Sequence, residues 1–280
     1  GLFTQGMVCH ETYKDQNNNW LNPDEVFSED GKNFFKINNK KERVIVGPSE
    51  SMSKSKKNTI DPQNIINQYG ADAVRFFILA DSPPERDVQW SEEGMKSSYK
   101  FIQKFWLLNQ EILQISKNKS DDVNESIEIF TNQSINKINQ ALEKFRYNVI
   151  IATYHEIYAF YKKIVEKGIN FKNLKHSFQK TLLVMLPVTP HLANECLEKL
   201  NYDKNFLWPD VEDKFLKEET STIVIQVNGK KRGVLSIEAN VQEEEIVNQI
   251  KKRKLIDKYL NNGNFIKTIY VKNRLINFII

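Results

Sequence analysis

GPSESMSKSKKNTIDP, residues 47–62, is a cationic and hydroxyl-rich stretch with no apolar period. It follows a short β-branched segment and ends in the aspartate–proline pair that is typical of a helix start. We therefore expect an exposed, mobile loop between a strand and a helix. The ammonium groups of Lys54, Lys56 and Lys57, together with hydroxyls and backbone N–H groups, can bind a polyphosphate. The alternative is a solvated basic loop, because such runs are common on surfaces and this one lacks the glycines of a Walker loop.

The composition of the 280 residues, 40% hydrophobic and 27% charged, is ordinary for a globular protein of two or three domains. No apolar run approaches the ~18 residues of a membrane span, so we expect a soluble, cytoplasmic protein with no membrane partner. Cys9 and Cys196 lie far apart, and the four histidines show no ligand spacing. A disulfide framework and a protein-bound metal are therefore not expected.

Upstream of the loop, the pattern indicates strands. Residues 2–8 predict an apolar strand that begins without a preceding element, which is typical of the middle of a domain. Asparagine-rich turns delimit two further short strands, at about 33–37 and 43–46. We expect residues 13–46 to form a small β insertion.

Downstream of the loop, the pattern becomes helical. Asp61 is expected to cap a helix that Gly70 ends, and Asp72 is expected to cap the next helix. A rigid connector with two prolines then leads to Ser91, which is expected to cap a long helix.

Periodic apolar residues predict a bundle of four or five helices between about residues 92 and 200. A loop is expected from 117 to 125, where the sequence is polar. Tyr154, Tyr158 and Tyr161 follow helical spacing, and we interpret them as core or half-buried residues rather than as a platform for stacking bases.

The C-terminal residues switch to a period of two, and Asn228-Gly229 is the strongest short turn signal for a hairpin. A hairpin at 222–237, a helix at 242–254 and strands at 265–271 and 275–280 predict a small α+β domain. From Ser221 onward, 11 Lys and Arg against 5 Asp and Glu give a net charge of +6, whereas the first 220 residues carry 29 against 31, or −2. This segment is a candidate for binding RNA, the alternative being a solvated basic face.

Several segments, in this order, resemble the C-terminal part of a bacterial-type leucyl-tRNA synthetase, a class I aminoacyl-tRNA synthetase. They are GLFTQGMV (1–8), NWLNPDEV (19–26), MSKSKKNTIDP (52–62), YGADAVRFFIL (69–79), SPPERDVQWSEEG (82–94), LPVTPHLANE (186–195) and IQVNGKKRG (225–233). The lysine–serine loop identifies class I alone, whereas residues 82–94 and the insertion favour the leucyl enzyme over the valyl, isoleucyl and methionyl enzymes. Ser51 stands where the family loop has its first lysine, and Lys54 keeps the second.

The resemblance implies a multidomain α/β and α fold. Residues 1–90 would be the C-terminal part of the Rossmann-like, nucleotide-binding catalytic domain, with the insertion at about 13–46 and the lysine–serine loop at 51–55. Residues 91–205 would be a helical bundle of the anticodon-binding type. A linker at 206–220 would then lead to a small α+β tRNA-binding domain at 221–280.

The activity implied by the resemblance is the ATP-dependent attachment of leucine to tRNA(Leu) through leucyl-adenylate, with Mg²⁺ accompanying ATP. Lys54 would be the main protein cation on the departing pyrophosphate, and Lys56 and Lys57 would tune affinity. The implied ATP-binding residues are Gly6, Met7, Val8, Met52, Ser53, Lys54 and Ser55. For the first three, a plain core strand is the alternative. The candidate tRNA-binding residues, at the hairpin and the helix end, are Lys230, Lys231, Arg232, Lys251, Lys252, Arg253 and Lys254.

The His-Ile-Gly-His phosphate site of the family, most of its leucine pocket and its editing insertion lie upstream of the residues present here. We therefore expect a fragment of a longer chain, or one subunit of a split enzyme, that is inactive in isolation. Two alternatives remain open: a non-catalytic RNA-binding protein derived from a synthetase, and a class I synthetase for valine or isoleucine.

Overall fold

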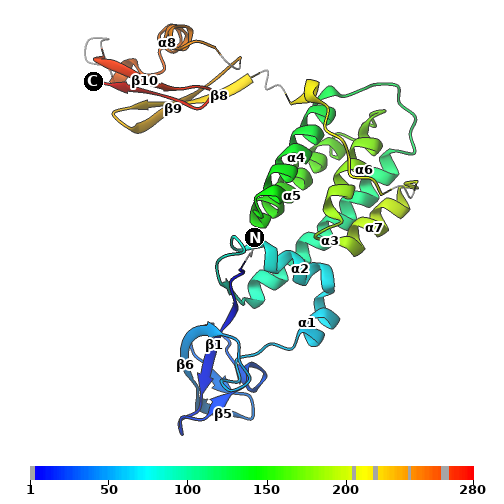
Figure 1. The fold of residues 1–280 in the computed structure, drawn as a ribbon, viewed down its shortest axis with the longest axis vertical. Coiled ribbons are helices and arrows are strands. Elements are labelled where there is room, and N and C mark those ends of the chain that lie inside the picture. Colours follow the sequence, from blue (N-terminus) through cyan, green and yellow to red (C-terminus); the bar gives the residue numbers. More distant parts are fainter. Residues whose placement is uncertain (1–3, 204–205, 217–219, 239–240, 260–264) are drawn as a thin grey trace. The chain divides into compact units, whose positions relative to one another are not determined.

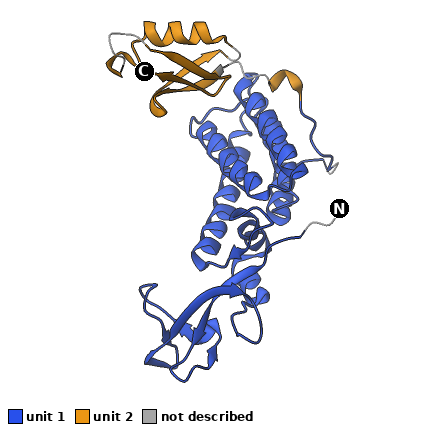
Figure 2. Cartoon of the chain, turned by 60° about the vertical axis from the view of Figure 1, so that its left-hand side comes forward, with its two compact units in different colours: residues 1–211 blue, residues 212–280 orange. Residues whose placement is uncertain are grey.

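The fold is given by a computed structural model that describes residues 4–203, 206–216, 220–238, 241–259 and 265–280 (Figure 1). The chain divides into two units, residues 1–211 and 212–280 (Figure 2). Each unit has its own hydrophobic core. Within the described ranges, no helix is long and apolar enough to cross a membrane.

A four-stranded sheet lies at the start of the first unit. Its strands are β1 (Val8–Lys14), β2 (Trp20–Leu21), β6 (Ile45–Ser51) and β7 (Val88–Gln89). β1 pairs antiparallel with β2 and β6 and parallel with β7. The strand predicted at residues 2–8 begins only at its last residue. The N–H groups of Gly6 and Met7 bond to residues 84 and 87, just before β7, and Met7 C=O accepts from Val88 N–H of β7 at 2.9 Å. Residues 2 and 3 lie outside the described residues.

Strand β6 extends into the stretch that was expected to be a loop. The pairing register shifts opposite Thr12, and Pro48 is the extra residue of the resulting bulge. A Cβ on Gly47 would lie 2.4 Å from Thr12 Oγ1, so this close approach requires glycine. The expectation of a loop from residue 47 is therefore wrong, and the loop starts only after Ser51. Glycine and proline, which normally break strands, here mark the bulge.

The insertion between β2 and β6 is confirmed as a small β structure. Its antiparallel strands are β3 (Val26–Phe27), β4 (Phe35–Lys36) and β5 (Asn39–Arg43), preceded by the short helix η1 (Pro23–Glu25). The strand predicted at 43–46 was misplaced, since it covers the end of β5 and the start of β6.

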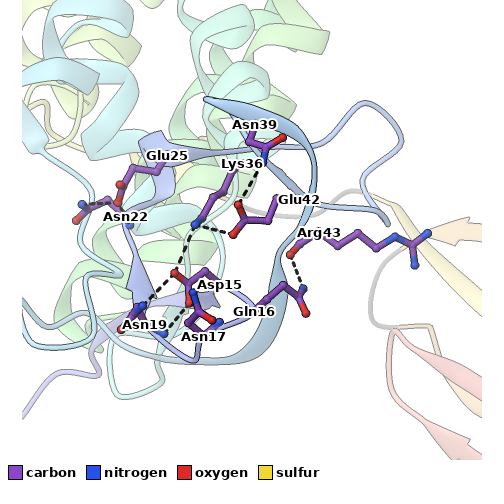
Figure 3. Close-up of polar contacts among 10 residues, drawn as sticks. All are labelled: Asp15, Gln16, Asn17, Asn19, Asn22, Glu25, Lys36, Asn39, Glu42 and Arg43. Carbon is purple, nitrogen blue, oxygen red and sulfur yellow. Dashed lines mark hydrogen bonds and ion pairs between the residues drawn. The ribbon is translucent and has the colours of Figure 1, made fainter.

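A polar network joins the insertion to the end of β1 (Figure 3). Lys36 Nζ lies 3.4 Å from Asp15 Oδ2 and 2.7 Å from Glu42 Oε1. Asp15 also accepts from the backbone N–H groups of Asn19 and Asn17, each at 2.9 Å. The bond from Asn19 is the main reason why the pKa of Asp15 lies below its ordinary value. The network thus fixes the turn from which the insertion emerges.

The two helices after the loop are α1 (Pro62–Tyr69) and α2 (Ala71–Ala80). The predicted cap is confirmed, because Asp61 Oδ1 accepts from Gln63 N–H at 2.9 Å. Gly70 ends α1 as expected, with a φ of 80°. Asp72, predicted as a cap of its own helix, instead lies in the first turn of α2 and faces the bundle, and that prediction was wrong.

Residues 92–203, all of which the structure describes, form the helical bundle (Figure 1). Its helices are α3 (Glu92–Ile115), α4 (Glu125–Glu143), α5 (Tyr147–Val165), α6 (Leu174–Met185) and α7 (Pro190–Lys199). Ser91 caps α3 by accepting from Gly94 N–H at 3.1 Å, as predicted. Tyr154 and Tyr161 are 0% exposed, and Tyr154 O–H donates to Val184 C=O at 2.8 Å. The interpretation of these two tyrosines as core is confirmed.

Asp72 caps helix α7 from a distance. Its carboxylate accepts from Leu192 N–H at 2.7 Å and contacts His191 Nδ1 at 2.8 Å. The residue before α7, Thr189, makes no side-chain cap of its own. A buried anion from α2 therefore satisfies the positive end of α7 and fastens the two helices together.

Asp72→Ala is expected to destabilise the chain by about 1–3 kcal/mol, because it leaves the buried Leu192 N–H without its acceptor. Urea unfolding followed by circular dichroism measures this free energy. The control is His191→Ala, which keeps the bond to Leu192 and removes a side chain that is 75% exposed. An equal loss in both variants would contradict the assignment of the stabilisation to the buried N–H.

The second unit confirms the predicted α+β pattern. Its elements are η2 (Asp213–Phe215), β8 (Thr220–Val227), β9 (Lys230–Glu238), α8 (Glu243–Lys252), η3 (Asp257–Tyr259), β10 (Lys267–Val271) and β11 (Leu275–Ile279). The strand order is β10-β11-β8-β9, and Ile246 and Ile250 of α8 pack on one face of the sheet. Asn228 and Gly229 both have positive φ, which makes the tight hairpin turn.

Candidate functional site

The lysine–serine loop, residues 52–57, leaves the sheet at the end of β6 and returns toward α1. Its first residue stays tied to β1, because Met52 N–H donates to Val8 C=O at 3.1 Å. Lys57 N–H donates to Lys54 C=O at 3.3 Å, and Lys57 has a positive φ of 55°. Residues 52–57 therefore form a tight turn, which starts after β6 and not at residue 47 as predicted.

The three lysines of the loop differ in their contacts. Lys54 is exposed, and no described residue forms an ion pair with its ammonium group. Lys56, in contrast, pairs with Glu50 of β6. The pKa of Glu25 in η1 lies below its ordinary value, mainly through the backbone N–H of the preceding Asn22 and to a smaller extent through the charge of Lys57. Lys54 and Lys57 are thus the two exposed cations of this loop that form no ion pair with a described residue.

The serines of the loop bond mainly to the loop itself. Ser53 Oγ lies 3.2 Å from Ser55 Oγ and accepts from Lys56 N–H at 3.3 Å. Ser53 N–H donates to Asn58 Oδ1 at 2.8 Å. Of the donors predicted for phosphate, the Ser53 backbone group is therefore used within the protein, and the hydroxyls remain available to exchange partners.

Gly6, Met7 and Val8 lie beside the base of the loop. Gly6 N–H donates to Pro84 C=O at 2.7 Å, and Met7 N–H donates to Asp87 Oδ1 at 2.8 Å. A Cβ on Gly6 would lie 2.1 Å from the carbonyl oxygen of the connector at residue 86, so no larger residue fits. The structure thus brings Val8 next to Met52, whereas Gly6 and Met7 contact residues 84–88, and the role of all three toward adenine stays a prediction.

Two residues that sequence reasoning missed hold the loop in place. Glu50 is the partner of Lys56, and Asn58 bonds to the loop and to both neighbouring strands. A glutamate in a strand and an asparagine in a polar stretch carry no distinguishing signal in one sequence. Only the pairing of β1 with β6 brings their partners together.

The candidate tRNA-binding residues in the second unit are all exposed. They are Lys230, Lys231 and Arg232 at the start of β9, and Lys251, Lys252, Arg253 and Lys254 at the end of α8. The Arg232 guanidinium lies 4.3 Å from the ring centroid of Tyr259 in η3. This contact links the first cluster to the segment that follows the second. Whether the clusters bind tRNA stays a prediction.

The sequence was compared with families and proteins of known function. Residues 42–91 match the family model of class I tRNA synthetases (I, L, M and V), and residues 124–247 match that of the anticodon-binding domain of tRNA ligase. The leucine–tRNA ligase of Rickettsia bellii (strain RML369-C) is 37% identical over 284 residues, which cover 100% of this chain and 34% of that protein. The chain matches the C-terminal part of leucine–tRNA ligases over its whole length. The ligase of Orientia tsutsugamushi (strain Boryong) is also 37% identical, over 100% of this chain and 33% of its own length.

The chain therefore spans about a third of the length of the leucine–tRNA ligases that it matches, and it corresponds to their C-terminal part. One solved structure, the ternary complex of the Agrobacterium radiobacter K84 agnB2 LeuRS with tRNA and LeuAMS, shares its fold. The TM-score is 0.67 at 22% identity, over 82% of this chain and 31% of that chain. The predicted fold class, a multidomain portion of a synthetase, is confirmed.

Proposed function

We propose that this chain is part of a leucine–tRNA ligase, which activates leucine with ATP and attaches it to tRNA(Leu). The observation that carries the proposal is the similarity to such ligases over the whole chain, combined with a lysine–serine loop that keeps the second family lysine, Lys54, exposed and unpaired among the described residues. The loop would bind the substrate ATP, and Mg²⁺ would accompany the ATP. Within the described residues, no group of three or more His, Cys, Asp or Glu is arranged to hold a metal ion.

The chemistry assigned to the loop is electrostatic. When the leucine carboxylate attacks the α-phosphate, the bond to pyrophosphate breaks and negative charge grows on the departing group. A fixed cation that meets this charge stabilises the transition state more than the ground state. We assign this role to Lys54, with Ser53 and Ser55 donating through their hydroxyls. Met52 would hold the loop to β1, and Gly6, Met7 and Val8 would lie on the adenine side.

The remaining two thirds of the ligase length would supply the rest of the active site, in the same polypeptide or as a second subunit. Residues 1–90 would act in catalysis, residues 91–205 would form the anticodon-binding type of bundle, and residues 221–280 would bind tRNA after a linker at 206–220. Such an enzyme would act in the cytoplasm. The competing function, RNA binding without catalysis, would not need the exposed Lys54 in a loop fixed to the sheet.

The direct test is leucine-dependent exchange of pyrophosphate into ATP by the complete ligase that contains this chain. We expect exchange with leucine and much less with valine or isoleucine. A preference for valine or isoleucine would reassign the amino acid. No exchange with any of the three, together with retained RNA binding, would favour the non-catalytic function.

Ser51→Lys restores the first lysine of the family loop, and it is expected to change the exchange rate by less than about threefold. Ser51 is exposed at the end of β6, where a longer side chain fits, and Lys54 already supplies a cation. Pyrophosphate exchange at saturating ATP measures the effect. A gain above about tenfold would show instead that the natural loop is impaired by lacking this ammonium group.

A further inference from the structure

One buried amide joins the lysine–serine loop to the sheet beside it. Asn58, the residue after the loop, is 0% exposed. Its Oδ1 accepts from Ser53 N–H at 2.8 Å, and its Nδ2 donates to the carbonyls of His10 at 3.2 Å and Glu50 at 3.1 Å, with that of Ser51 at 3.5 Å. These partners belong to β1, to β6 and to the loop. A single side chain thus connects three segments.

This set of contacts requires an amide. One end of the side chain must accept from an N–H group while the other end donates to carbonyls. An ionised aspartate at position 58 has no donor and would turn a negative charge toward the carbonyls of His10 and Glu50. Alanine would leave the Ser53 N–H without this acceptor and the two carbonyls without this donor. The same contacts settle which end of the Asn58 amide is oxygen.

Asn58 joins the two ends of the loop, at residues 53 and 58. Its partner Ser53 lies directly before Lys54, and Lys57 turns the chain back with its positive φ so that residue 58 meets residue 53. The backbone on both sides of Lys54 is therefore fixed to β1 and β6. A charge stabilises a transition state only from a defined position, and a displacement of about 1 Å can cost on the order of 10²-fold in rate.

We propose that Asn58 is a positioning residue for Lys54. Its hydrogen bonds hold the two ends of the loop, at residues 53 and 58, against β1 and β6, and so set where the ammonium group of Lys54 meets the pyrophosphate. This inference rests on the proposed function. Asn58 is buried beneath the loop and acts only through it. Because its bond also uses Ser53 N–H, phosphate would be met by Lys54 and by the hydroxyls and not by that backbone donor.

The test is a double-mutant cycle of Asn58→Ala and Lys54→Ala in the complete ligase, read as leucine-dependent pyrophosphate exchange. Asn58→Ala is expected to lower kcat by about 10-fold to 10²-fold with little change in KM for ATP, since Lys54 acts in the transition state. In the Lys54→Ala background the same change is expected to cost less than about threefold, because the positioned group is already absent. A full loss in both backgrounds would overturn the proposal, and so would the absence of a loss from Asn58→Ala alone.

Asn173→Ala is the matched control. The Asn173 amide also bridges distant backbone, donating to Asn124 C=O at 3.0 Å and accepting from Asn124 N–H at 3.2 Å, but it does so in the helical bundle. It is expected to lower stability without lowering kcat. If it lowered kcat as much as Asn58→Ala, the effect at Asn58 would be general destabilisation and the proposal would fail.

Amide hydrogen exchange gives a second measurement that does not depend on activity. Asn58→Ala is expected to remove the protection of Ser53 N–H while the amides of α3 stay protected. Unchanged protection of Ser53 N–H would overturn the proposal that Asn58 holds the ends of the loop in place. Full activity of the Lys54→Ala single variant is a different failure: it would refute the role of Lys54 in the proposed function, and with it the coupling to Asn58.

Discussion

Replacing Lys54 with alanine in the complete ligase is expected to slow leucine-dependent pyrophosphate exchange by about 10²–10³-fold, or ~3–4 kcal/mol, which is the usual effect of losing one electrostatic contact to a developing charge. The ammonium group is exposed at the tip of a turn whose base is fixed to two strands. It can therefore meet the pyrophosphate without first breaking an ion pair to a described residue. The substitution should lower kcat and leave KM for ATP nearly unchanged.

Lys56→Ala is the matched control for this prediction. It removes one positive charge from the same loop, two residues away, but its ammonium group is already paired with Glu50. We expect it to lower the exchange rate by less than about tenfold. The assignment of Lys54 would be falsified if Lys54→Ala kept an exchange rate within about threefold of the unsubstituted enzyme.

Features that depend on neighbouring residues could be predicted from the sequence. Asp61 and Ser91 cap helices through N–H groups two and three residues away. The Asn228-Gly229 turn depends on the φ angles of its own two residues. The helices of the bundle could be predicted from the spacing of their apolar residues alone, because a helix places every third or fourth side chain on one face. In all these cases the deciding contact lies within a few residues of the chain.

Features that depend on distant contacts were missed. Residues 47–51 were predicted as part of a loop, whereas pairing with β1 places them in β6, with Pro48 in a bulge. Asp72 reads as a local cap, yet it accepts from a helix 120 residues later. In the site, the sequence motif indicates Lys54. It does not indicate that Asn58 holds the turn in place, because the partner of Asn58, His10, is 48 residues away. Such contacts leave no mark on local pattern or composition.

Removing residues 212–280 from the complete ligase is expected to leave leucine activation nearly unchanged and to lower kcat/KM for tRNA by on the order of 10²-fold. The core of each unit is made of its own residues, so the deletion leaves the core of residues 1–211 complete. If about three of the exposed basic residues contact phosphates, at about 1 kcal/mol each in water, their loss gives roughly this factor. Pyrophosphate exchange and leucylation of tRNA, measured on the same truncated enzyme, separate the two effects.

The charge itself is tested by neutralising Lys230 and Lys231, both exposed beside the hairpin turn, with glutamine. The dependence of tRNA affinity on salt should then weaken, by a slope of about 0.7–0.9 for each phosphate that the protein no longer neutralises. Neutralising Lys267 and Lys272, which are exposed on the same unit but outside the two clusters, removes the same charge and is expected to change the slope less. Equal changes would mean that only the net charge matters.

For the deletion of residues 212–280, equal losses of activation and leucylation would mean that the unit serves folding. Unchanged leucylation would mean that the unit does not engage tRNA productively.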